Sequence, residues 1–278
     1  MNGTGMILLI DAGNTRVKFG WLEPGGMRRE PVPLALAHAE LDGLAAWLAA
    51  LPARPSGALG ASVAGAAMTA ALDALIERHC GLPVRWQHST ASAGGVLNLY
   101  ENPASLGTDR WISLVGLAAR TPAAALLASF GTATTVDTLG PSRERESGGA
   151  PAGRRFEGGL ILPGPELMRR ALANGTAGLP YAEGDSTGFP RNTHAAISSG
   201  IAAAQAGAVL RQWRSAIETL GVAPELYCTG GGWPLVAGEL AAVLARHQAD
   251  LGLPAQAPRW LDAPVLDGLA SLAAAATA

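Results

Sequence analysis

One segment near the N-terminus, Ile7-Leu8-Leu9-Ile10-Asp11-Ala12-Gly13-Asn14-Thr15, joins an apolar run to an acid, a glycine and two small polar residues. Beyond it, Val17 and Phe19 alternate with polar residues. This pattern predicts a buried strand, a tight turn and a second strand with one covered face. Gly13 allows a sharp turn and close approach of a ligand. Backbone N–H groups in such a turn can hold an anion while a nearby aspartate holds a cation. The segment is therefore a candidate phosphate and Mg²⁺ hairpin, and the alternative is an ordinary hairpin whose turn is capped by Asp11.

A similar pattern returns in the middle of the chain, at residues 125–137. When Gly131 is aligned with Gly13, Ser129 takes the place of Asp11. The repeat is too long for a solenoid unit, which has a period of roughly 20–50 residues. It therefore predicts two similar lobes, each presenting a glycine turn toward a shared cleft.

A third glycine segment, residues 226–232, ends a short apolar run with three consecutive glycines. Glycines without side chains let a flat ligand lie close to the backbone. The alternative is a loop that needs only flexibility.

Helical and strand-like patterns interleave along the chain, which predicts an α/β protein. The expected lobes are residues 1–118 and 119–278. Further strands are expected at 58–63, 84–87 and 156–162, and helices at 40–51, 66–79, 103–119, 165–174 and 193–220, with a packing helix at the C-terminus. The charged, glycine-rich segment 141–155 is expected to be a mobile hairpin tip.

The overall composition excludes several classes of protein. The 278 residues are 49% hydrophobic and 15% charged, so the chain can bury a large core. A net charge of −2 argues against a nucleic-acid binder. Lys18 is the single lysine, so no P-loop motif is present and a Schiff base could form only there.

Cysteine usage and hydropathy predict a cytoplasmic protein with no membrane partner. Cys80 and Cys228 lie far apart without a C-x-x-C motif, which fits a reducing compartment. The sequence shows no signal peptide and no apolar run of about 20 residues. The histidines are scattered without the spacing of zinc ligands.

Two further segments carry candidate site residues. Gly107-Thr108-Asp109-Arg110, downstream of Tyr100, places an acid beside an arginine, as a base and an anion clamp would require. The alternative is a helix-start acid favoured by the helix dipole, beside a solvated arginine. Asn192-Thr193 precedes a long helix, where Thr193 is either the helix cap or a hydrogen-bond partner of a substrate.

Gly159 permits either close approach of a ligand or tight packing. The tryptophans are expected to be packing residues.

Together and in this order, these motifs resemble those of the type III pantothenate kinases, from about residue 6 to about residue 275. The matching residues are Asp11-Ala12-Gly13-Asn14-Thr15, Tyr100, Gly107-Thr108-Asp109-Arg110, Gly131-Thr132-Ala133-Thr134-Thr135, Gly158-Gly159, Pro163-Gly164, Asn192-Thr193 and Thr229-Gly230-Gly231.

The resemblance implies a fold and an activity. The fold would be two ribonuclease-H-like lobes of the acetate/sugar kinase–Hsp70–actin superfamily, with a cleft between them, in a homodimer. The activity would be ATP-dependent phosphorylation of pantothenate to 4'-phosphopantothenate, the first step of coenzyme A biosynthesis. A kinase for another small hydroxyl or carboxylate substrate, or a nucleotide-binding regulatory protein of the same fold, is the alternative.

The resemblance also implies roles for individual residues. ATP and its phosphates would be bound by Asp11, Ala12, Gly13, Asn14, Thr15, Arg16, Val17, Lys18 and Thr132, with Gly230 and Gly231 near the adenosine. Pantothenate would be bound by Tyr100, Gly107, Thr108, Asp109, Arg110 and Thr193. Asp109 would be the proton acceptor, and Asp11 would hold Mg²⁺ through water.

One position departs from the family pattern. The family often carries an aspartate two residues before the second glycine turn, where it binds a required monovalent cation. Here that residue is Ser129, a neutral and weaker ligand. Either the requirement for K⁺ or NH₄⁺ is relaxed, or other oxygens complete the site, so the cation site is not carried over to Ser129.

Overall fold

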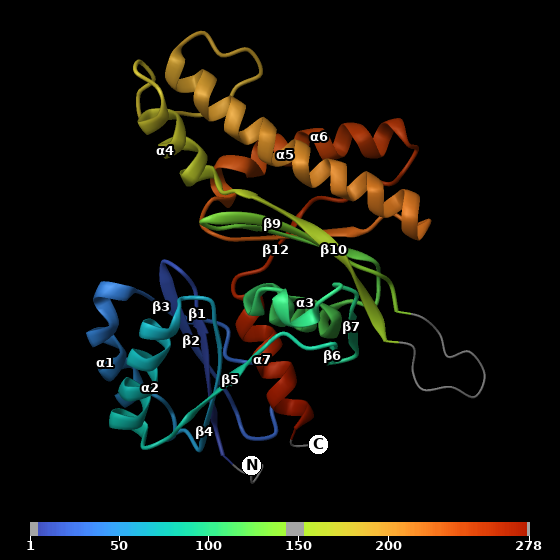
Figure 1. The fold of residues 1–278 in the computed structure, drawn as a ribbon. Helices are drawn as coiled ribbons and strands as arrows, with labels where there is room; N and C mark the ends of the chain where they lie inside the picture. Colours follow the sequence, from blue (N-terminus) through green and yellow to red (C-terminus); the bar gives the residue numbers. More distant parts are fainter. Residues whose placement is uncertain (1–4, 143–152, 277–278) are drawn as a thin grey trace, which may run out of the picture. The chain divides into compact units, whose positions relative to one another are not determined.

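The computed structural model describes residues 5–142 and 153–276 (Figure 1), and the chain forms two compact units. Unit 1 comprises Met1–Pro122, Arg143–Phe156 and Ala263–Ala278, and unit 2 comprises Ala123–Ser142 and Glu157–Asp262. The last helix of the chain thus belongs to the same unit as the first strand. This grouping divides the chain differently from the expected lobes 1–118 and 119–278, which stay a prediction.

Unit 1 contains a five-stranded sheet in the order β3-β2-β1-β4-β5. The first three strands run antiparallel, and β4 and β5 run parallel to β1. This is the ribonuclease-H-like arrangement. The strands are β1 Ile7–Ala12, β2 Arg16–Leu22, β3 Leu34–Ala37, β4 Gly57–Ser62 and β5 Val84–Gln87, with a small hairpin of β6 Ser92–Ala93 and β7 Val96–Asn98. The helices are α1 Leu44–Ala49, α2 Ala66–Cys80, α3 Thr108–Arg120 and α7 Pro264–Ala275, with 3-10 turns at His38–Gly43 and Pro103–Ser105.

Unit 2 repeats this topology. Its strands lie in the order β12-β11-β8-β9-β10. β8 and β9 are antiparallel, whereas β8, β11 and β12 are parallel. The α/β class and the duplicated fold are therefore confirmed. The elements are β8 Ala125–Phe130, β9 Ala133–Leu139, β10 Arg154–Pro163, β11 Glu225–Thr229, β12 Arg259–Trp260, α4 Pro165–Gly175, α5 Thr193–Leu220 and α6 Trp233–Asp250. The first residues of β10 belong to unit 1, where they pair with β7.

Each unit has its own core on the sheet. In unit 1, Leu8 and Ile10 of β1 pack with Leu72 and Ile76 of α2, while α3 and α7 contact the sheet as well. In unit 2, α5 and α6 lie side by side on one face (Figure 1). Trp213 of α5 is fully buried there, as expected, and its indole nitrogen donates to the carbonyl of Pro224 at 3.1 Å.

Several predicted elements differ in detail from the structure. The expected helix 103–119 is interrupted, because Leu106 is extended and α3 begins only at Thr108. The expected helix 40–51 is a 3-10 turn followed by the short α1. The cap of α5 is Asn192, whose side chain accepts from the backbone N–H of Ala195 at 2.9 Å, and Thr193 is the first helical residue. The tip expected at 141–155 falls largely outside the described residues.

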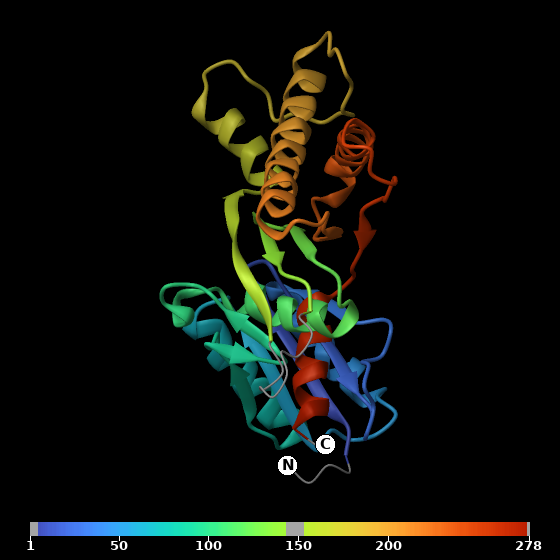
Figure 2. The same cartoon turned by 90° about the vertical axis from the view of Figure 1, so that its right-hand side faces the viewer.

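Helices α3 and α7 pack backbone to backbone, as Figure 2 shows within unit 1. A Cβ atom on Gly268 of α7 would lie 1.9 Å from the carbonyl oxygen of Ile112 on α3, and one on Gly116 of α3 would lie 2.7 Å from the backbone nitrogen of Gly268. No real side chain tolerates such distances, so the two glycines fix how closely the helices approach. Asp109 and Arg110 stand at the start of α3, so this contact also sets the position of those side chains.

We expect Gly268→Ala to lower the free energy of unfolding by about 2 kcal/mol or more, because the added methyl group forces two helix backbones apart. The matched control is Gly207→Ala in α5, where a Cβ meets nothing within 4 Å. That change should raise stability by roughly 0.5–1 kcal/mol, the usual gain from glycine to alanine in a helix. Urea denaturation measures both, and equal effects of the two substitutions would contradict the close contact.

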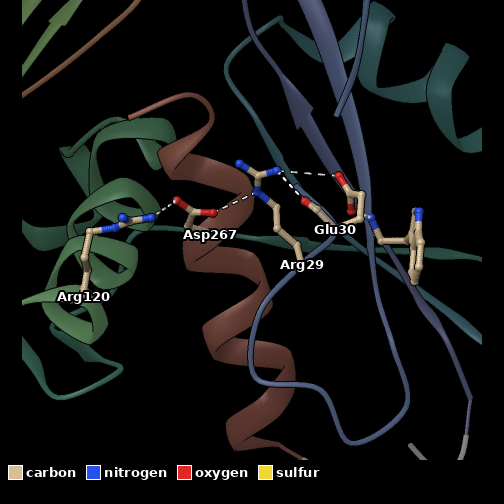
Figure 3. A network of polar contacts seen from close by, with 5 residues as sticks. Arg29, Glu30, Arg120 and Asp267 are labelled. Carbon is tan, nitrogen blue, oxygen red and sulfur yellow. Dashed lines mark hydrogen bonds and ion pairs between the residues drawn. The ribbon is translucent and has the colours of Figure 1, made fainter. Parts of the chain in front are cut away.

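A polar network holds the outer side of α7 to the sheet (Figure 3). Arg29 Nε donates to Asp267 Oδ1 at 2.8 Å, and Arg120 Nη2 lies 3.5 Å from Asp267 Oδ2. The carboxylate of Glu30 accepts from the backbone N–H of Trp21 at 2.5 Å. Burial raises the pKa of Glu30. The network therefore ties together β2, the segment that follows it, the end of α3 and α7.

Candidate functional site

The first part of the candidate site is the β1–β2 hairpin of unit 1. The N–H of Gly13 donates to the carbonyl of Arg16 at 3.0 Å, which closes a tight turn with Asn14 and Thr15 exposed at its tip. Ala12 and Val17 are buried below it. One neighbour of this turn comes from outside the hairpin. The ring Nε2 of His38 lies 2.9 Å from the carbonyl oxygen of Gly13, a contact that no local pattern signals.

Asp11 stands at the end of β1 in an environment that disfavours its charge. Burial raises the pKa of its carboxyl group to about 7, the charge of Lys18 opposes that rise, and the charge of Asp109 adds to it. Lys18 is the cross-strand partner of Asp11 in the hairpin. The effect of Asp109 shows that the two carboxylates lie near each other. Two carboxylates that lie near each other form a donor set that suits a divalent cation.

Asp109 is the second residue of α3, at the positive end of the helix. Its Oδ1 accepts from the backbone N–H of Arg110 at 2.8 Å. A Cβ atom on Gly107 would lie 2.9 Å from this Oδ1, so the glycine leaves room for the carboxylate. Among the described residues, Oδ2 of Asp109 has no hydrogen-bond partner. The geometry fits both a helix-start acid and a base with one oxygen available.

Arg110 is buried and held by aromatic rings, so its interpretation as a solvated arginine is wrong. Its side chain donates from Nη1 to the hydroxyl of Tyr100 at 2.9 Å. Its Cζ lies 5.6 Å from the ring centre of Tyr100 and 5.9 Å from that of Phe156. These two rings stack at 5.4 Å. Cation–π contact and the hydrogen bond fix the guanidinium in one place. Phe156 was missed because its sequence context indicates only a strand.

In unit 2, three glycine turns meet at the carboxyl ends of β8 and β11, the edge where parallel sheets commonly bind ligands. The N–H of Gly164 donates to the carbonyl of Thr132 at 3.0 Å, and that of Gly232 donates to Phe130 at 2.8 Å. Helices α4 and α6 both begin at these turns. The positive ends of these helices favour an anion.

The constraint that excludes a side chain differs among the glycines of these turns. A Cβ on Gly164 would lie 2.0 Å from the carbonyl oxygen of Gly131. Gly230 has a φ of +98°, and its Cβ would lie 2.5 Å from the carbonyl oxygen of Phe130. Packing therefore requires both. A Cβ on Gly231 would meet nothing within 4 Å, so the fold itself does not require glycine there. A ligand that lies close to the backbone would explain why Gly231 has no side chain.

Ser129 lies in a row of hydroxyl side chains. It pairs with Thr135 of β9 and with Thr229 of β11, so the three side chains share one face of the sheet. These hydroxyls offer neutral oxygens, which suit a monovalent cation less well than a carboxylate does. In the residues that the structure describes, no group of three or more histidine, cysteine, aspartate or glutamate residues could hold a metal ion.

Thr193 lies apart from the glycine turns, at the start of α5. With Arg191 and Asn192 it lines a cavity of about 810 Å³, whose other walls come mainly from apolar side chains of α4 and α5. The structure thus places the predicted residues in two sets. Unit 1 holds residues 11–18, Tyr100 and residues 107–110, and unit 2 holds Thr132, Thr193, Gly230 and Gly231. Among helices of the described chain, none is both long and apolar enough to cross a membrane.

Comparison with known proteins gives one consistent family. Residues 7–215 match the family model described as type III pantothenate kinase. A type III pantothenate kinase from Bordetella pertussis is 50% identical over 274 residues, which cover 97% of this chain and 98% of the relative. One from Azoarcus sp. is 41% identical over 272 residues, covering 97% and 91%. The solved activator of the 2-hydroxyisocaproyl-CoA dehydratase from Clostridium difficile, with bound ADPNP, aligns over 98% of this chain and 94% of its own, at 12% identity and a TM-score of 0.48.

The family model spans most of the chain, and these relatives are similar along almost all of it. The chain therefore belongs to the type III pantothenate kinase family.

Proposed function

We propose that this protein transfers the γ-phosphoryl group of ATP to pantothenate, giving 4'-phosphopantothenate and ADP in the first step of coenzyme A biosynthesis. The observation that carries the proposal is the start of α3. There Asp109 lies near Asp11, and Arg110 is fixed by Tyr100 and Phe156. This arrangement offers a proton acceptor and a preoriented positive charge together.

Phosphoryl transfer needs positioning and charge neutralisation more than covalent help. A carboxylate is too weak a base to deprotonate a free alcohol in the ground state. In a loose transition state, Asp109 need only orient the hydroxyl group and accept its proton late. Arg110 supplies a positive charge that cannot be lost by deprotonation. Tyr100, Gly107 and Thr108 complete the proposed pantothenate set in unit 1, with Thr193 in unit 2.

The divalent cation that accompanies ATP would be held by Asp11, through water, since Mg²⁺ keeps several of its water ligands. When bound, it neutralises charge on the transferring phosphoryl group. The Gly13 turn, with Asn14 and Thr15, would bind phosphate through its backbone. In unit 2 the turn of Gly131 and Thr132 would do the same, and Gly230 and Gly231 would lie along the adenosine.

We further propose that K⁺ or NH₄⁺ activates this protein only weakly. The support is the row of Ser129, Thr135 and Thr229, which provides hydroxyl oxygens but no carboxylate at this register position.

A coupled assay of ADP release with Mg-ATP, with and without pantothenate, tests the function and the cation dependence together. We expect turnover that depends on pantothenate, at similar rates in K⁺ and Na⁺ buffers. A large excess of rate in K⁺ would overturn the weak activation while leaving the kinase in place. Absence of pantothenate-dependent turnover in both buffers would overturn the function and favour another acceptor or an accessory nucleotide-binding role.

We also propose that the protein works as a cytoplasmic homodimer without nucleic-acid or membrane partners. The support is apolar surface on unit 2. Phe189 is 91% exposed and Ile161 is 64% exposed, and the apolar cavity between α4 and α5 lies in the same unit. Sedimentation equilibrium should give twice the chain mass, and a single chain mass at micromolar concentration would overturn the dimer.

A further inference from the structure

Three aromatic rings form a column in unit 2 that runs from the core to the surface. Phe130 and Trp233 stack with their ring centres 5.8 Å apart and their planes inclined at 29°. Trp233 and Trp260 stack at 6.4 Å and 28°. Phe130 is fully buried, whereas Trp260 is 48% exposed. Trp260 packs against Trp233, as expected of a packing residue, and ends the column with a large part of its surface in solvent.

The sheet explains why this tryptophan is uncovered. Trp260 pairs with Cys228 of β11 in parallel register, so both side chains point to the face of the sheet on which α5 and α6 pack. β12 is the edge strand, and α6 begins only at Trp233. The ring of Trp260 thus packs against Trp233 at the edge of the sheet and keeps part of its surface exposed.

The column stands beside the glycine turn 230–232. Trp233 follows Gly232 directly, and its N–H donates to the carbonyl of Gly230 at 3.1 Å. The turn includes Gly231, where a side chain would fit but none is present. An open backbone surface and a half-exposed indole ring therefore lie one aromatic ring apart, at the carboxyl ends of β8, β11 and β12.

We propose that Trp260, supported by Trp233, is the base-stacking wall of the nucleotide site and makes the protein select a purine nucleotide. This rests on the proposed function, because it deepens the assignment of the 230–232 turn to the adenosine. A large flat base would lie against the exposed surface of the Trp260 ring. Stacking on an aromatic side chain strengthens binding without hydrogen-bond readout. A pyrimidine offers a smaller ring and gains less from the same wall.

Steady-state kinetics of Trp260→Leu test the proposal. The leucine keeps an apolar side chain but removes the ring. We expect the KM for ATP to rise about tenfold or more, with kcat and the KM for pantothenate within about twofold of their original values. The KM for UTP should change much less, so the preference for ATP over UTP falls. Trp260→Phe should retain most of the ATP affinity, which excludes a general loss of folding as the cause.

Arg259→Gln is the matched control on the same short strand. Arg259 lies over the ring of Tyr227 and pairs with Glu225 at 2.9 Å, on the opposite face from Trp260. It should leave the KM for ATP unchanged. Equal effects of Arg259→Gln and Trp260→Leu, or an unchanged KM and ATP/UTP preference in Trp260→Leu, would overturn the stacking wall.

A calorimetric titration with ADP separates this proposal from the proposed function. If Trp260→Leu weakens ADP binding about tenfold while the original protein does not phosphorylate pantothenate, the stacking wall stands and the function falls. If the protein phosphorylates pantothenate and both forms bind ADP equally, the function stands and the wall falls. Absence of ADP binding by the original protein would overturn both.

Discussion

Asp109→Asn should reduce kcat for pantothenate phosphorylation by a factor on the order of 10² or more, while the dissociation constant of ATP stays within about twofold. Asparagine cannot accept a proton from the attacking hydroxyl group. It does retain the Oδ1 oxygen that accepts from the backbone N–H of Arg110 at 2.8 Å. The start of α3 therefore survives the substitution, and only the proton-accepting function is removed.

The Asp109→Asn substitution distinguishes the two roles that fit the geometry of Asp109, a helix-start acid and a catalytic base. If the carboxylate only stabilises the helix start, the Asp109→Asn variant should turn over pantothenate almost normally, which would contradict its assignment as the base. Pre-steady-state product formation together with ATP binding by calorimetry gives the answer. Glu101→Gln, an exposed acid nearby in the sequence, is the charge-matched control and should leave kcat unchanged.

Asp11→Asn should have opposite effects on stability and activity. Without Mg²⁺ at pH 8, we expect it to raise the free energy of unfolding by about 1–2 kcal/mol, because it removes a carboxylate whose charge the fold disfavours. It should lower turnover with Mg-ATP by a factor on the order of 10². Chemical denaturation and the coupled assay measure the two effects on the same protein.

The pH dependence of this stability difference follows from the pKa of Asp11, which is about 7 in the fold against an ordinary value of 3.8. Above pH 7 the carboxyl group is ionised in both the folded and the unfolded chain, so the fold bears the whole cost of the charge. Between these two pKa values the carboxyl group is protonated in the folded protein but ionised in the unfolded chain. The loss of stability caused by the charge therefore becomes smaller as the pH falls. The advantage of the Asp11→Asn variant should thus be complete above pH 7 and gone below pH 3.8. A difference that grows toward acid pH would contradict the raised pKa.

The sequence predicts the hairpins and their duplication well, because those features depend on local patterns. The run from Ile7 to Thr15 has its strand and turn encoded in adjacent residues, and the same holds for the turn at Gly131. The proximity of Asp11 and Asp109 is visible only in the structure. No spacing along the chain connects two residues on separate elements.

Long-range contacts are what the sequence could not provide. The cage of Arg110 needs Phe156 from a distant strand, and the approach of α3 to α7 needs Gly268 opposite Ile112. These partners lie far apart along the chain, so no periodicity reveals them. Trp260 sits in a strand of two residues, which is too short to leave an alternating pattern.

The return of the chain to unit 1 has a consequence for how the protein folds during synthesis. Domains usually fold as units in the order in which they leave the ribosome. Here unit 1 begins first, but α7 follows the last residue of unit 2. Unit 2 therefore has all its residues before unit 1 does. Until α7 emerges, the surface of α3 around Gly116 lacks the helix that packs on it. We therefore expect unit 2 of the nascent chain to finish folding before unit 1.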